Sequence, residues 1–110
     1  MGSGPYPNLG GAIPAYLVTP PGSAASFKNI AANGNSQVKT GPGTLQGVIV
    51  NTLGVTSTLA LYDGTSASGT PIATINTAQA FGEEFNLAFA TGLFAVTAGG
   101  TPANVTITFE

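Results

Sequence analysis

The chain has 110 residues, enough for one domain with a single hydrophobic core. Charged residues make up 5% of it, against about 25% in typical domains, and two lysines without any arginine argue against nucleic acid as a partner. The chain has no cysteine, no histidine and no apolar run near the roughly 20 residues of a membrane-spanning helix, which excludes disulfides, thiolate metal sites and a histidine base, and argues against a membrane partner.

The first segment, residues 1–24, is rich in proline and glycine. Its five prolines remove backbone donors and fix φ, which excludes a helix or a central strand and indicates an extended arm. Apolar side chains are spaced along it and are the expected partner-binding residues: Tyr6, Leu9, Ile13, Tyr16, Leu17 and Val18. Two interpretations stay open, a solvated terminus or an arm that orders on a neighbouring surface.

Residues 25–110 form the second zone, in which short segments of alternating apolar and polar residues are separated by turn signals such as Asp-Gly and Gly-Pro. We expect strands at 26–30, 37–40, 44–52, 57–62, 71–76, 83–89, 93–97 and 104–110. Residues 77–81 are compatible with a single turn, and no segment has the pattern of a long helix. The prediction is an all-β domain, a compact antiparallel β-sandwich or jelly roll, preceded by the arm.

The segment 44–52 differs from the other predicted strands, because Leu45, Val48, Ile49 and Val50 leave neither of its faces polar. Such a strand is either buried on both faces or contacts another subunit. A surface with little charge also loses little to desolvation in an interface. These two features favour a homo-oligomer, and we expect a trimer.

The acidic residues give little support for catalysis. Glu83 and Glu84 are neighbours in a predicted strand, so their side chains point to opposite faces. Asp63 can meet a glutamate only through the tertiary fold, and Asp63-Gly64 after a strand is more typical of a turn than of a calcium loop. We therefore expect no catalytic residues, no metal ligands and no cofactor.

The aromatic residues of the second zone are expected mainly in the core. Phe85, Phe89, Phe94 and Phe109 all stand at strand positions. Tyr62, beside the Asp63-Gly64 turn, either stacks on a ligand at a loop tip or closes one end of the core.

Three stretches carry a resemblance to a known group of proteins. They are Val38-Lys39-Thr40-Gly41-Pro42-Gly43-Thr44-Leu45 leading into Val48-Ile49-Val50-Asn51, residues 61–70 leading into Ile72-Ala73-Thr74-Ile75, and Gly92-Leu93 with residues 96–107. Residues 37–109 resemble small structural proteins of tailed bacteriophages and prophages, of the head decoration or cement type. The resemblance implies a compact β-sandwich, often oligomeric on the capsid, with no catalytic residues; some relatives look like parts of fibres or tails.

The predicted function is therefore non-enzymatic. We expect a virion protein that binds the major capsid protein at the capsid surface, and stabilises the shell because it binds only the assembled form. The alternative is a receptor- or glycan-binding module of a phage head or tail fibre. A cellular β-sandwich, such as an adhesin domain, is the third possibility.

Overall fold

The computed structural model describes residues 25–110, which form eight β-strands. The strands are β1 (Ser26–Ile30), β2 (Gly34–Thr40), β3 (Gly43–Thr52), β4 (Thr58–Asp63), β5 (Ala73–Asn76), β6 (Gly82–Phe89), β7 (Gly92–Ala98) and β8 (Asn104–Phe109). Every predicted strand is present, and the largest shift is the earlier start of β2. This part of the chain contains no helix that could cross a membrane.

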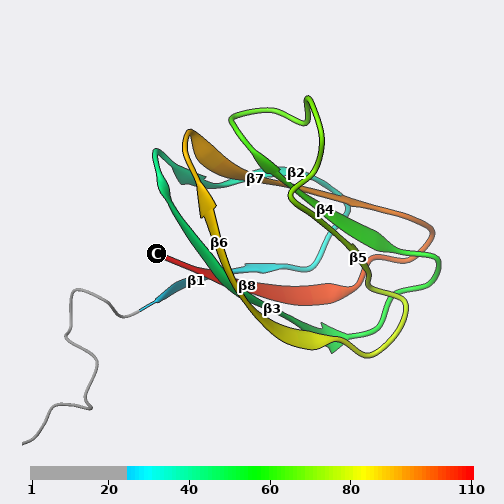
Figure 1. Cartoon of the computed structure of the whole chain (residues 1–110). Helices are drawn as coiled ribbons and strands as arrows, with labels where there is room; N and C mark the ends of the chain where they lie inside the picture. Colours follow the sequence, from blue (N-terminus) through cyan, green and yellow to red (C-terminus); the bar gives the residue numbers. More distant parts are fainter. Residues whose placement is uncertain (1–24) are drawn as a thin grey trace, which may run out of the picture.

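The strands pair as a long hairpin that has been rolled up. β1 pairs with β8, β2 with β7, β3 with β6 and β4 with β5, all antiparallel, so the hairpin tip lies between β4 and β5. Rolling brings β3 beside β8 and β4 beside β7, which gives two four-stranded sheets, β1-β8-β3-β6 and β2-β7-β4-β5. The two sheets pack face to face (Figure 1). This strand order is that of a jelly roll, so the predicted fold class is confirmed.

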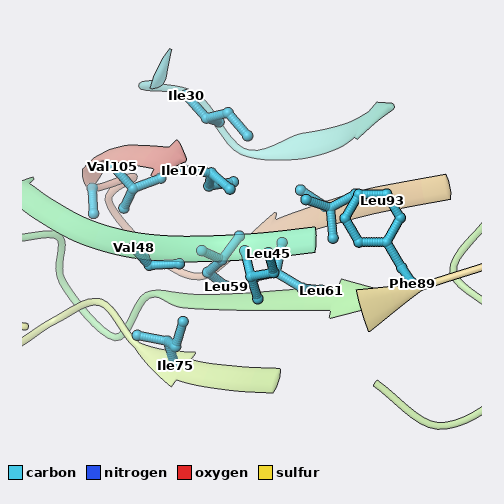
Figure 2. Packing of buried hydrophobic residues seen from close by; sticks show 12 residues of the cluster. Ile30, Leu45, Val48, Leu59, Leu61, Ile75, Phe89, Leu93, Val105 and Ile107 are labelled. Atoms are coloured by element: carbon cyan, nitrogen blue, oxygen red, sulfur yellow. The ribbon is translucent and has the colours of Figure 1, made fainter. Parts of the chain in front are cut away.

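The space between the sheets is filled by aliphatic side chains (Figure 2). Those with no exposed surface are Leu45, Val48, Leu59, Leu61, Leu93, Ala95, Val105 and Ile107. Most of them recur at every second position of a strand, because alternate side chains of a strand point to the same face. Each large buried side chain stabilises the fold by about 1.5–3 kcal/mol relative to an exposed one.

The structure of β3 explains why the sequence 44–52 has apolar residues on both predicted faces. The register shifts at Gln46 in the ladders with both β6 and β8, so Leu45 and Val48 reach the same interior despite their odd spacing. Val50 also packs against the core. Ile49 is the one member of the group on the outer face, where it is 49% exposed. The two-sided pattern therefore arises largely from a β-bulge.

The aromatic residues follow the prediction except at Phe94. Phe89 is buried, and Phe85 and Phe109 are half-buried against the core. Phe94 faces outward, because its neighbours in β7 take the interior positions, and it lies opposite Tyr62 of β4. The core assignment of Phe94 was wrong because both faces of β7 are apolar and the sequence alone does not say which is inside. Tyr62 stands half-buried on this outer face.

A glycine in the connection between β3 and β4 provides a stability test of the packing. A Cβ atom at Gly54 would collide with the Ser57 hydroxyl and with the backbone of Thr101 and Ala103. We expect Gly54→Ala to lower the free energy of unfolding by about 1–3 kcal/mol. Gly82→Ala is the matched control, since no atom lies within 4 Å of its added Cβ, and it should change stability by less than about 0.5 kcal/mol. Denaturant titration of both variants measures the difference, and equal stabilities would contradict the packing.

Candidate binding surfaces

The predicted partner-binding residues, Tyr6, Leu9, Ile13, Tyr16, Leu17 and Val18, lie outside the described residues. The arm joins the described part at Ala25, directly before β1, which is an edge strand of its sheet. The same end of the jelly roll carries Gly41, Thr91 and Glu110, linked through backbone hydrogen bonds and strand pairing. We call it the arm end.

Asp63 stabilises a turn at the arm end. Its carboxylate accepts hydrogen bonds from the backbone N–H groups of Ala90 and Thr91, each 2.9 Å away, and a longer one of 3.4 Å from Gly92. These bonds, with those from Ala90 and Thr91 the largest contributions, lower the pKa of Asp63 below its ordinary value. Asp63 therefore has a structural role in the β6–β7 turn. The sequence alone indicated only that Asp63-Gly64 forms a turn after β4.

The carboxylates do not converge on one site. Glu83 is in register with Val48 and Glu84 with Gly47, so the two side chains start on opposite sides of β6, as expected for neighbours in a strand, and both are exposed. Glu84 stands six residues before Ala90, the residue whose N–H binds Asp63, and six extended residues span about 20 Å. Among residues 25–110, no group of three or more acidic, histidine or cysteine side chains could hold a metal ion.

The opposite end of the jelly roll displays two large aliphatic side chains. Leu53 is 51% exposed and Val55 is 59% exposed, and both belong to the connection between β3 and β4. We call this pair the apolar tip. Turn segments usually carry polar residues, so the sequence Leu53-Gly54-Val55 is a signal that sequence reasoning passed over.

The backbone of the apolar tip is firmly held. The Val55 N–H donates to the Thr101 carbonyl at 3.0 Å, and the Val55 carbonyl accepts from Gly100 and Thr101, both at 3.1 Å. Thr56 has a positive φ of 50°, which is uncommon for a β-branched residue, and its hydroxyl binds the Val55 carbonyl and the Gly100 N–H. Because the loop is ordered beforehand, little backbone entropy is lost when the apolar tip is covered by a partner.

A third surface is an open groove of 660 Å³ on the outer face of the sheet β1-β8-β3-β6. It is lined by Ala25, Gln46, Gly47, Ile49, Gly82, Glu83, Glu84, Phe85 and Thr108. Two glycines form its floor: Gly47 is closely surrounded by the Glu83 carbonyl and the Thr108 hydroxyl, and Gly82 faces open space. Phe27, in register with Thr108, is 71% exposed on the same face. The groove is therefore mainly apolar and uncovered by described residues.

A network of side-chain amides and hydroxyls also lies on this outer face. The side-chain amide of Asn51 donates to the Asn104 carbonyl oxygen at 3.0 Å and to the Thr106 hydroxyl at 2.9 Å. The amide of Asn29 donates to Asn104 and Thr106 as well. These bonds link side chains of β1, β3 and β8 across the sheet.

Comparison of the chain with protein-family models, curated proteins and solved structures finds no match. No relative therefore supplies a function for the arm end, the apolar tip or the groove. The roles proposed for these surfaces rest on their own geometry and chemistry.

The cap formed by Asp63 predicts a pH-dependent contribution to stability. The folded-state pKa is depressed, so the stabilisation is present above the unfolded-state pKa and is lost as the pH falls through the folded-state value. At pH 7, we expect Asp63→Ala to have a lower melting temperature than the native chain. The gap should close in strong acid. Glu84→Gln, which also removes one exposed charge, is the control. A constant gap between pH 7 and pH 2 for Asp63→Ala would contradict the cap.

Proposed function

We propose that this chain is a non-enzymatic decoration protein that binds the surface of a bacteriophage capsid and connects neighbouring subunits of the major capsid protein. The observation that carries the proposal is the placement of two contact regions at opposite ends of one rigid domain. The arm leaves at Ala25, and the apolar tip lies beyond the far end of β3. The ten residues of β3 span about 33 Å, so a molecule held at both ends bridges separate sites.

The composition of the surface supports a protein partner. The side chains of the described residues that carry a charge at neutral pH are Lys28, Lys39, Asp63, Glu83, Glu84 and Glu110, and Asp63 is occupied by the β6–β7 turn. An apolar surface with few charges can be buried at small desolvation cost. Exposed apolar groups that gather on such a surface are typical of protein interaction sites.

The jelly-roll fold is compatible with this role. Jelly rolls occur in viral capsid proteins, lectins and cupins, and a fold alone does not define a function. The exposed aliphatic side chains of Leu53 and Val55 favour a protein-binding role over a glycan-binding one. The resemblance of residues 37–109 to phage structural proteins supports the virion as the location.

We also propose that the protein acts as a homotrimer, which would multiply weak contacts with the shell by avidity. Sedimentation of the isolated protein should then show a species heavier than the monomer at micromolar concentration. A monomer across that range would contradict assembly in solution.

Two variants test the bridging model by co-sedimentation with undecorated particles. Deletion of residues 1–18 should abolish detectable binding, because the arm residues are removed. Leu53→Ser combined with Val55→Ser should weaken binding by about tenfold or more, since about 1.4 kcal/mol corresponds to a factor of ten and two exposed aliphatic side chains contribute roughly this much when buried. Each variant should also lower the melting temperature of the decorated shell.

Leu87→Ser is the control, since Leu87 is an aliphatic side chain, 39% exposed on the edge strand β6, that belongs neither to the arm nor to the apolar tip. Thermal melting of each isolated variant verifies folding. Full binding after deletion of residues 1–18 would reject the arm as a contact. Native binding by the tip variant would reject the bridge. Binding to host cells with none to particles would favour the receptor-binding alternative.

A further inference from the structure

We propose that the groove on the outer face of β1-β8-β3-β6 is the binding site for Tyr16, Leu17 and Val18 of the same chain. This inference goes beyond the proposed function, because it concerns the isolated molecule and assigns an intramolecular role to residues 16–18 of the arm. It rests on the position of the groove, on the point at which the arm joins the domain and on the chemistry of both surfaces.

The junction lies at the groove itself. Ala25, the first described residue, is one of the lining residues, so residues 1–24 begin at the rim. From there the groove crosses Thr108 of β8 and Gly47 of β3 to Glu84 of β6. Three inter-strand spacings amount to about 14 Å.

The length of the intervening chain fits this distance. Val18 precedes Ala25 by seven residues, which reach at most about 23 Å when extended. Residues 16–18 can therefore reach any point of the groove, and the tether keeps them at a millimolar-range effective concentration. Pro20 and Pro21 restrict the tether, which reduces the entropy lost when it becomes ordered.

The chemistry of the two surfaces is complementary. The missing side chain at Gly82 leaves a trough beside Ile49, which is in register with Gly82 and has 49% of its surface exposed. Residues 1–24 contain no Asp, Glu, Lys or Arg, so their side chains bring no charge into this trough at neutral pH. Glu83 and Glu84 also line the groove, and both are exposed on the edge strand β6. Aliphatic side chains of the arm would cover Ile49 without leaving a buried charge unpaired.

This assignment divides the arm into two parts. Residues 16–18 hold the base of the arm on the domain, whereas Tyr6, Leu9 and Ile13 remain available for a partner. The direction in which the distal part leaves the domain is then set by the groove rather than by the β1 junction alone.

The absence of native cysteine allows a direct crosslinking test on the full-length protein. Leu17→Cys is combined with Ile49→Cys in the groove, and the control pair combines Leu17→Cys with Thr74→Cys, an exposed position of β5 in the other sheet. Under mild oxidation, we expect the groove pair to form an intramolecular disulfide at least about tenfold faster than the control pair, because binding raises the local thiol concentration. Non-reducing electrophoresis and mass spectrometry of the monomer band give the rates.

A blocking variant provides the second measurement. Gly82→Leu fills the open space above the groove floor without a backbone clash, and it should slow the groove pair to the control rate. Equal rates for the two pairs, an unchanged rate with Gly82→Leu, or disulfides only between two chains would each overturn the assignment. Deletion of residues 1–14 should retain the fast crosslink and lose particle binding. Slow crosslinking with intact particle binding would reject the groove assignment alone.

Discussion

Burial of leucine, isoleucine and valine side chains between the two sheets is the interaction on which the rest of this protein depends, because the chain has few other means of stabilising itself. It has no cysteine for disulfides, and charged residues make up only 5% of the sequence. The buried polar side chains of the described residues, Ser57 and Thr77, satisfy each other through a 2.7 Å hydrogen bond. An interior this uniform favours close packing of the sheets, and it leaves the loops and outer faces free to vary without loss of the fold.

The outer surface also carries few charged residues, and this low charge affects how the protein can bind a partner. Asparagine, threonine and serine keep it hydrated, and the backbone is held by hydrogen bonds rather than by ion pairs, as in the tip loop around Val55 and in the turn bound by Asp63. Exposed aliphatic side chains are therefore presented on ordered backbone at the apolar tip and beside the groove. Rigid presentation lowers the entropy lost on binding, so surfaces of modest size can be effective in a repeated assembly, where many weak contacts act together.

Much of the fold could be predicted from the sequence, because the signals involved are local. Alternation in Leu59–Leu61 and Val105–Ile107 identifies strands and their inward faces, and turn residues separate them. The pairing of β1 with β8, the orientation of Phe94 and the bulge at Gln46 depend on contacts between distant segments, which a local pattern does not contain. The same reason applies to the surfaces. The sequence showed an arm with apolar residues, but the cap made by Asp63, the exposure of the apolar tip and the groove above Gly47 arise only when separate strands are brought together.

The rolled hairpin also has a consequence for biosynthesis. Of the eight described strands, β1 is synthesised first, whereas its partner β8 is synthesised last and lies between β1 and β3. The first sheet thus cannot close until β8 has emerged, and pairing between such distant segments is intrinsically slow. During synthesis, at about 5–20 residues per second, the unpaired strands stay exposed for several seconds. A product that stops short of β8 would leave β1 without its partner and β3 with an open edge. Only molecules that contain β8 would complete the outer face on which Ala25, Phe27 and the groove lie, so incomplete chains would be excluded from any assembly that uses that face.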